Sequence, residues 1–327
     1  AVEFAASRSG MAAMAVPAVP LRVLTFNIRM DRKEDNPNDN WSGERRDAVV
    51  AFLRWADADV VGLQEVTPGQ LQFLADALAP EYGYVGIGRE PGGAGEASPL
   101  FFRAGRLRVV RHETRWLSTS PDKPGSKFTG AGCPRVVTSA ELLQSDGGRF
   151  FCFCTHLDHV GMQGEYAIQR EQARILCSLA DAFCGDSPLP RVILGDFNSV
   201  REAGAPPVLF EACYHDCSDG DDTATFVQFN DRKSQTGAVN HIDWIFVRGA
   251  LYGGYTTYDA KYGHSSGERR NASDHIAVGV RLLPGAEDGA AARALPATGC
   301  HCAVQLRPRG AAACSCSAAC VHACPLP

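Results

Sequence analysis

Short apolar segments of this chain end repeatedly in polar residues that can bind metal ions or transfer protons. The segment VILGDFNSV, residues 192–200, begins as an ordinary buried strand and then places Asp196 and Asn198 two positions apart. Side chains two apart on a strand share a face, so this carboxylate and this amide can point to one place. Five further apolar segments carry such groups, at Asn27, Glu65, His156, Asp243 and Asp274–His275.

This pattern limits the folds that the chain can adopt. A buried polar group without a partner costs roughly 1–3 kcal/mol, and a buried charge costs more. The free energy of unfolding of a typical protein is only about 5–15 kcal/mol. Several buried polar groups without partners would offset most of it, so we expect these groups to face one another across a shared cleft. The histidines, His156 and His275, can donate or accept protons near neutral pH. Four residues offer hard oxygen atoms of the kind that bind Mg²⁺, or Mn²⁺ as a substitute: Asn27, Glu65, Asp196 and Asp274.

The apolar segments predict a mixed α/β fold. Apolar residues at helical spacing predict helices at 43–56, 69–78 and 164–183, and only Gln172 interrupts the apolar face of the third. Strands and helices do not alternate strictly, which favours packed mixed sheets with outer helices over a doubly wound nucleotide-binding fold. Segments rich in Val, Ile, Phe and Leu predict strands at 21–28, 59–66, 135–143, 149–157, 191–197, 241–247 and 275–283.

The composition predicts one domain with a different segment at each end. Residues 21–284 form the expected domain, and residues 1–20 resemble a leader or an expression remnant without fixed structure. Residues 285–327 form a tail rich in Ala, Pro and Cys. The Cys and His residues of this tail could bind a soft metal ion, but their spacing is unlike common zinc patterns, so we predict a disordered low-complexity tail.

The net charge and the cysteine content of the chain limit the binding partners and the cellular compartment that we expect for it. A net charge of -5 argues against extended binding to duplex nucleic acid, and no apolar run is long enough to predict a transmembrane helix. The 13 cysteines form an odd set without a disulfide framework, which favours a reducing compartment such as the cytoplasm. We expect a monomer.

Six short motifs resemble those of the endonuclease/exonuclease/phosphatase superfamily, the DNase I-like metal-dependent phosphoesterases. The residues of these motifs most resemble those of the branch that contains CCR4 and nocturnin-like enzymes. The resemblance implies a four-layered α/β sandwich, with two mixed β-sheets packed face to face and helices on both outer surfaces. The motifs, in chain order, are TFN at 25–27, QE at 64–65, THL at 155–157, GDFN at 195–198, IDWIF at 242–246 and SDH at 273–275.

The resemblance also implies a role for each motif residue in the attack of water on phosphorus. Glu65 would hold Mg²⁺ together with Asn27, and Asp274 would complete the metal site. Asp196 and Asn198 would handle the nucleophilic water or a second metal ion and steady the phosphate. His275 would be the general base, or a donor to phosphate oxygens, and Asp243 would orient its imidazole. His156 would stabilise charge on a phosphoryl oxygen.

Other residues are candidates for substrate contacts. Arg135, at the start of a predicted strand, could bind phosphate or be a solvated strand-end arginine. Trp41 and Arg45 could line the cleft or belong only to the start of a helix. Arg29 stands where some family members have an acidic residue, which puts a second metal ion that depends on that position in doubt.

The resemblance leaves the substrate open. RNA 3′ ends, as in exoribonucleases and deadenylases, or nucleotides are the leading classes, and lipid or sugar headgroups are the alternative. DNA cleavage and a catalytically inactive binding module are further alternatives, although the complete motif set argues against the last. We expect specificity to depend on the loops at 86–99, 118–134 and 218–240.

Overall fold

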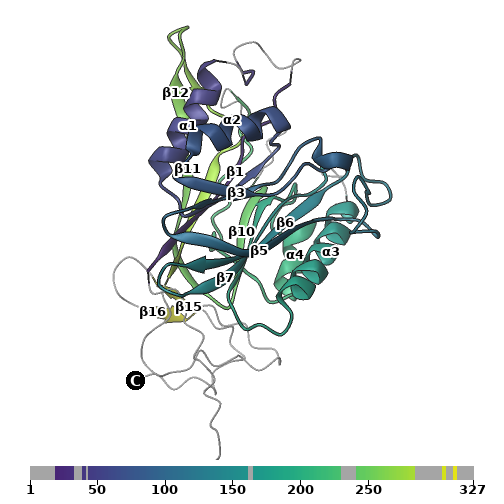
Figure 1. Cartoon of the computed structure of the whole chain (residues 1–327). Coiled ribbons are helices and arrows are strands. Elements are labelled where there is room, and N and C mark those ends of the chain that lie inside the picture. The colour runs from purple at the N-terminus through teal and green to yellow at the C-terminus, as the bar shows by residue number, and fades with distance from the viewer. Residues whose placement is uncertain are drawn as a thin grey trace, which may run out of the picture.

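Two six-stranded mixed sheets face each other in this protein (Figure 1). The structure is a computed structural model that describes residues 19–32, 39–41, 43–160, 165–229 and 241–283, and two short strands in the tail. Helices lie on the outer surface of each sheet. The predicted fold class, a four-layered α/β sandwich, is therefore confirmed.

The first sheet contains the first two predicted strands and the last. Strand β1 pairs with β2 in parallel and with β14 in the antiparallel sense. The order across the sheet is β11 (Leu251–Tyr258), β14 (Ala277–Leu283), β1 (Leu21–Asn27), β2 (Val60–Gln64), β4 (Leu100–Arg103) and β3 (Tyr82–Val85).

The second sheet contains the other four predicted strands. Strands β7 and β8 are parallel, and β10 is antiparallel to β8. The order across the sheet is β5 (Leu107–Trp116), β6 (Val136–Gln144), β7 (Arg149–His156), β8 (Arg191–Asp196), β10 (Asp243–Arg248) and β9 (His215–Asp216). Two small antiparallel pairs complete the described strands, β12 (Lys261–Gly263) with β13 (Arg269–Asn271) and β15 (Val304–Leu306) with β16 (Ala312–Cys314).

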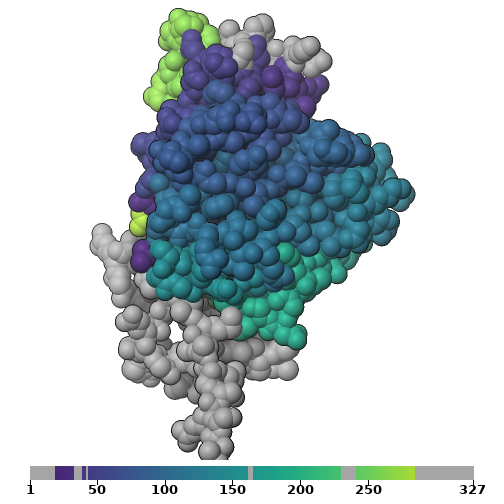
Figure 2. Space-filling model, viewed as in Figure 1, coloured from purple at the N-terminus to yellow at the C-terminus, as the bar shows by residue number. Residues whose placement is uncertain are grey.

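Three apolar clusters hold the layers together. One cluster fills the space between the two sheets. Helices α1 (Glu44–Ala56) and α2 (Pro68–Leu78) bury a second cluster on the first sheet, and helices α3 (Ala167–Cys184) and α4 (Ala205–Glu211) bury a third on the other sheet. A single 3₁₀ turn, η1 (Pro91–Gly93), lies in the loop after β3. In the space-filling view, residues from the first half of the chain cover most of the visible face (Figure 2).

Helix α3 buries the predicted face, including Gln172, which interrupts its apolar residues. Its buried side also contains Gln169. Gln172 Oε1 accepts a hydrogen bond from the backbone N–H of Asp158 at 2.8 Å, and Gln169 Nε2 donates to the carbonyl of Asp158. The residue that interrupts the apolar stripe therefore fixes the loop after β7 to the helix.

The pairing of the strands brings the motif residues to one end of the sandwich. Asn27 ends β1, and Glu65 directly follows its parallel neighbour β2. His156 and Asp196 end the parallel strands β7 and β8, while Asp243 begins the antiparallel strand β10. Parallel strands end at the same edge and an antiparallel strand begins there, so all these side chains meet at one edge.

Several strands, among them β3, β4, β5 and β11, were not predicted from the sequence. Strand β5 is the edge of its sheet, and most of its residues are at least partly exposed, so its sequence LRVVRHETRW lacks an apolar run. The predicted leader lies almost wholly outside the described residues, and so does the tail apart from β15 and β16. Among the described residues, no helix combines the length and apolar character needed to span a membrane.

Candidate active site

Three motif residues of the second sheet lie side by side in register. His156 is paired with Asp196 across β7 and β8, and Asp196 is paired with Asp243 across β8 and β10. The three side chains are almost completely buried. The sheet itself thus places an imidazole and two carboxylates at neighbouring positions.

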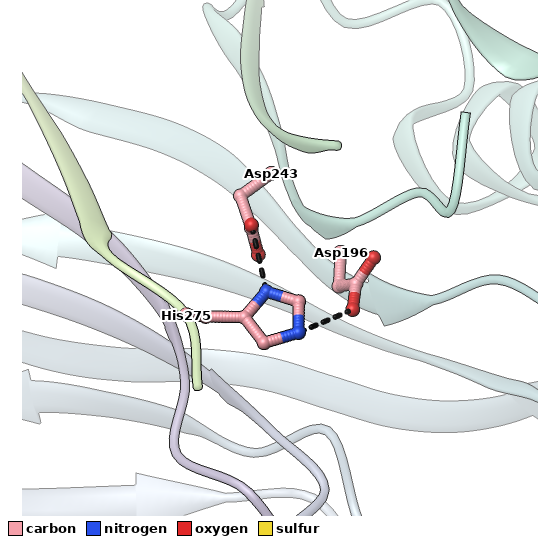
Figure 3. A group of neighbouring side chains, drawn as sticks. All are labelled: Asp196, Asp243 and His275. Atoms are coloured by element: carbon pink, nitrogen blue, oxygen red, sulfur yellow. Dashed lines mark hydrogen bonds and ion pairs between the residues drawn. The ribbon is translucent and has the colours of Figure 1, made fainter. Parts of the chain in front are cut away.

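The imidazole of His275 lies between the carboxylates of Asp243 and Asp196 (Figure 3). Its Nδ1 atom lies 2.9 Å from Asp243 Oδ2, and its Nε2 atom lies 3.7 Å from Asp196 Oδ2. A carboxylate on one ring nitrogen fixes the orientation of the imidazole and directs the other nitrogen to the reaction. This is the arrangement that the resemblance implied for Asp243 and His275.

His156 and Asn198 form a second polar pair beside Asp196. Asn198 Nδ2 lies 3.0 Å from His156 Nε2 and also donates to the carbonyl of Leu157 at 2.9 Å. The backbone N–H of Asn198 donates to Asp196 Oδ1 at 2.9 Å. Nδ1 of His156 has no hydrogen-bond partner among the described residues, so it is available to a ligand.

The first sheet adds the candidate oxygen ligands Asn27 and Glu65. Asn27 Nδ2 donates to Glu65 Oε1 at 3.0 Å and to Asp196 Oδ2 at 2.9 Å, although Asn27 and Asp196 are 169 residues apart. The backbone N–H of Met30 holds the other carboxylate oxygen of Glu65 at 3.0 Å. Asn27 therefore joins the two sheets at the site.

Asp274 is fixed by the loop that precedes β14. Ser273 Oγ donates to the carbonyl of Asn27 at 2.6 Å and lies 3.2 Å from Asp274 Oδ1. The backbone N–H groups of Val227 and Gln228 both donate to the carbonyl of Asp274 at 2.9 Å. These bonds hold the Asp274 carboxylate near the end of β1.

Three residues at the site have strained backbone conformations. Arg29, Glu65 and Asn198 have φ angles of 57°, 62° and 47°, in the left-handed region that few residues other than glycine adopt. Each costs of order 1–3 kcal/mol and persists only where the surrounding structure enforces it. Such strain is typical of functional sites.

The pKa values of two acidic groups at the site, Glu65 and Asp196, are shifted in opposite directions. Burial raises the pKa of Glu65, but hydrogen bonds from Met30 and Asn27 outweigh it and keep that pKa below its ordinary value. Burial and then the Asp243 carboxylate raise the pKa of Asp196. Burial lowers the pKa of His275. The charge of Asp243 and its hydrogen bond raise that pKa and contribute to a net upward shift.

A cavity of about 450 Å³ is lined by several polar side chains of the site, namely Glu65, His156, Asp196, Asn198, Asp274 and His275. Arg89 and Arg135 form another part of its wall, and their side chains are 16% and 5% exposed. Both oxygens of Glu96 contact Arg89, at 2.7 and 2.9 Å, and Arg135 lies 3.2 Å from Nδ1 of His159. The cavity wall thus combines carboxylates with guanidinium groups, those of Arg89 and Arg135 among them.

The sequence profile of the Endonuclease/Exonuclease/phosphatase family matches residues 24–275. The chain belongs to this family. The match spans all six motifs of the site, from Asn27 to His275. No curated protein sequence matches the chain. Members of the family are metal-dependent phosphoesterases, so the chain is a hydrolase of phosphoesters.

Solved structures agree with the family assignment. A protein of this family from Bacteroides thetaiotaomicron is similar at 28% identity and a TM-score of 0.72, over 82% of this chain and 96% of that one. A mannosyl-6-phosphatase of the same organism has 28% identity and a TM-score of 0.71, over 80% and 99%. The human nocturnin catalytic domain, at 15% identity and a TM-score of 0.59 over 81% and 95%, is similar in fold.

The donor set of this family member fits a divalent cation. One guanidinium nitrogen of Arg29 lies 3.9 Å from Glu65 and 3.8 Å from Asp274, so both carboxylates face one cationic point. The ligands are carboxylate and amide oxygens, as Mg²⁺ prefers. One ligand atom each from Asp196, Asp243 and His275 also lie within 4.8 Å of one another, although Asp243 already binds a ring nitrogen of His275.

The structure does not bring two of the predicted contact residues to the cavity. Trp41 is buried, with its ring edge-on to Phe73 at 6.0 Å. Arg45 is also buried and donates to the carbonyl of Ile28 at 2.7 Å. The prediction that Trp41 and Arg45 line the cleft is therefore corrected, because Arg45 supports the loop after β1 and Trp41 packs against Phe73 of helix α2. Arg135 does line the cavity.

Other residues that line the cavity were not predicted from the sequence. Arg89 and Glu96 lie in the loop after β3, which is rich in glycine and carries no motif, so no pattern separates them from solvated charges. Phe226 also lines the cavity, with its ring centre 5.0 Å from that of His275. His159 lines the cavity as well, and its closeness in sequence to His156 is explained equally well by a loop turn.

The contact between Asp243 and His275 leads to a first prediction. We expect Asp243→Asn to lower kcat by about 10²–10⁴-fold, because an amide no longer fixes the imidazole orientation or stabilises its charged form. Steady-state kinetics on the variant and on Asp243→Asn/His275→Ala test this. The double variant should be no slower than His275→Ala alone, since the two residues act as one unit. Additive losses would contradict the prediction.

Proposed function

We propose that this protein is a divalent-metal-dependent phosphatase of small phosphorylated compounds, with sugar phosphates as the leading class. The observation that carries the proposal is the cavity, whose wall contains Arg89 and Arg135 together with the carboxylates of the site. The Nε atoms of both arginines have no hydrogen-bond partner among the described residues, and such donors suit the oxygens of a terminal phosphate. The likeness to a mannosyl-6-phosphatase supports the same class.

We further propose a role for each residue in the reaction. Glu65, Asn27 and Asp274 would hold Mg²⁺ or Mn²⁺, which as a Lewis acid neutralises charge on the phosphate oxygens. Asp196 and Asn198 would orient the attacking water, which lies in line with the leaving group. His275, oriented by Asp243, would accept the proton of the water or donate to a phosphate oxygen. His156 would donate to a phosphoryl oxygen through Nδ1.

A substrate panel tests this proposal. We expect hydrolysis of mannose 6-phosphate or glucose 6-phosphate with Mg²⁺, and no hydrolysis after EDTA treatment. The panel also contains a phosphoinositide, sphingomyelin, plasmid DNA and poly(A) RNA. Turnover of the lipids or the plasmid but not of the sugar phosphates would contradict the substrate class, and turnover that persists in EDTA would contradict the metal dependence.

RNA 3′ ends or nucleotides remain a second candidate class, favoured by Phe226. An aromatic side chain on the cavity wall offers a surface for stacking of a base, which contributes about 1–3 kcal/mol per base in nucleic-acid-binding proteins. If poly(A) or a nucleotide is the better substrate, Phe226→Ala should raise KM with little change in kcat. In that case the same variant should leave KM for sugar phosphates unchanged.

A further inference from the structure

Two consecutive backbone N–H groups of the loop after β1 hold two candidate ligands of the metal site. The N–H of Arg29 donates to Asn27 Oδ1 at 3.0 Å, and the N–H of Met30 donates to Glu65 Oε2 at 3.0 Å. Asn27 ends β1, and Glu65 follows its parallel neighbour β2. The backbone conformation of residues 29–30 therefore helps to set where these two side chains place their oxygen atoms.

The buried side chain of Gln70 holds this loop from the first turn of helix α2. Its Nε2 atom donates to the carbonyl of Arg29 at 2.9 Å, and its Oε1 atom accepts from the N–H of Asp31 at 3.1 Å. Arg45 Nη2 lies 3.4 Å from the same carbonyl, so the bond from Gln70 is the shorter of the two. Gln70 is 1% exposed and is not among the described residues that line the cavity. It thus binds the backbone on both sides of Met30 without reaching the cavity itself.

The carbonyl of Arg29 and the N–H of Met30 belong to one peptide group. A peptide group is planar and trans, so its C=O and N–H point in opposite directions. A side chain that fixes the direction of this carbonyl therefore also fixes the direction of the N–H that holds Glu65. Arg29 has a φ angle of 57°, a conformation that persists only where the surrounding structure enforces it. The bond from Gln70 contributes to that enforcement.

Gln70 also fixes the segment that carries Glu65. Its Oε1 atom accepts from the N–H of Thr67 at 3.0 Å, and its own backbone N–H donates to Thr67 Oγ1 at 3.4 Å. These bonds form a capping box at the start of helix α2, two residues after Glu65. One side chain therefore joins the segment 65–67 to the segment 29–31.

We propose that Gln70 is a positioning residue of the metal site, which acts on Glu65 through the peptide group between Arg29 and Met30. A carboxylate that is already held in one orientation loses less conformational freedom when a cation binds, so the cation binds more tightly. Residues that orient metal ligands typically change metal affinity 10–100-fold when they are replaced. The inference rests on the metal dependence proposed above.

Calorimetric titration of the full chain with Mg²⁺, together with hydrogen exchange of the metal-free protein, tests the proposal. Gln70→Met keeps the approximate size of the side chain and removes its side-chain hydrogen bonds. We expect this variant to bind Mg²⁺ about tenfold more weakly than the wild type. The amide hydrogens of Met30 and Asp31 should exchange about tenfold faster, because the loop that carries them has lost its anchor.

Gln70→Glu is a second variant that separates the two hydrogen-bonding atoms of the side chain. Glutamate is a usual residue at this position of a capping box, and its oxygens can still accept from Thr67 and Asp31. Only the donor to the carbonyl of Arg29 is lost. We expect the amide of Met30 to exchange about tenfold faster in this variant as well, and wild-type exchange there would contradict the role of the carbonyl bond.

Thr67→Ala is the matched control, because it breaks the capping box but leaves the bonds from Gln70 to Arg29 and Asp31 in place. It should melt about 2–4 °C lower than the wild type, as expected for the loss of a helix cap. Its Mg²⁺ affinity and its Met30 exchange rate should stay within about threefold of the wild type, since the loop remains anchored.

A purely structural role of Gln70 would lower the melting temperature of Gln70→Met and leave its Mg²⁺ affinity and Met30 exchange unchanged. Wild-type values of either quantity in Gln70→Met, or an equal loss of affinity in Thr67→Ala, would overturn the proposal while leaving the proposed function intact. A wild type that binds no Mg²⁺ would overturn both.

Discussion

Replacement of Glu65 by Gln is expected to abolish Mg²⁺ binding and to lower kcat by about 10³-fold or more. Glu65 accepts hydrogen bonds from Asn27 and Met30, and its pKa is held below the ordinary value, so it presents a charged carboxylate to the cation. Loss of that charge removes several kcal/mol of electrostatic stabilisation, and each 1.36 kcal/mol is tenfold in rate. Glutamine keeps the size of the side chain, so the fold should persist.

The measurements are kcat for the best substrate of the panel and calorimetry with Mg²⁺. Glu96→Gln is the control, because Glu96 is a second carboxylate of the same cavity that Arg89 neutralises. Glu96→Gln should retain Mg²⁺ binding within about threefold, since it lies outside the ligand set. Wild-type Mg²⁺ affinity in Glu65→Gln would show that the cation is held elsewhere, for example at the group of Asp196, Asp243 and His275.

Replacement of Gly195 by Ala is expected to destabilise the protein strongly. Gly195 has a φ of 149°, and an added Cβ atom would overlap the backbone oxygen of Thr155 on the parallel strand β7. Strain and overpacking together predict a loss of about 3–5 kcal/mol in the free energy of unfolding. Because Asp196 is the next residue, the site would be displaced as well.

Thermal and chemical denaturation measure this effect. We expect Gly195→Ala to melt about 10 °C lower than the wild type, or to be recovered only as insoluble protein. Gly69→Ala is the control, since an added Cβ meets nothing within 4 Å in helix α2. It should be neutral or more stable by about 0.5–1 kcal/mol, as expected for glycine in a helix. Equal melting temperatures for the two variants would contradict the expected clash at Gly195.

The similarity to known proteins is more informative about chemistry than about substrate. The family match covers the site, and the Bacteroides structures extend over most of the chain. The likeness to nocturnin, at 15% identity, is one of fold. The proposed substrate class therefore rests on the cavity, where Arg89, Arg135 and Phe226 lie in loops or next to a strand end rather than within the sandwich.

Local patterns in the sequence were enough to predict most of the central strands and the candidate site residues at their ends. Strand segments such as 21–28 and 191–197 are apolar over most of their length, because both faces of these strands are buried between layers. A polar residue at the end of such a segment needs a partner or a ligand, so Asp196 and Asn27 were recognisable without coordinates. Local burial and local periodicity are properties that a short stretch of sequence encodes directly.

The contacts among these groups, and the charged side chains that join them, could not be predicted without the three-dimensional fold. Asn27 meets Asp196 across 169 residues, and Arg29 meets both Glu65 and Asp274, through strand register and loop conformation that no local pattern specifies. The same holds for Arg45, whose position in the sequence suited the cleft but whose side chain supports a backbone carbonyl instead. Contacts between distant segments depend on the packing of the whole sandwich, because a shift of one residue in register turns a side chain to the opposite face.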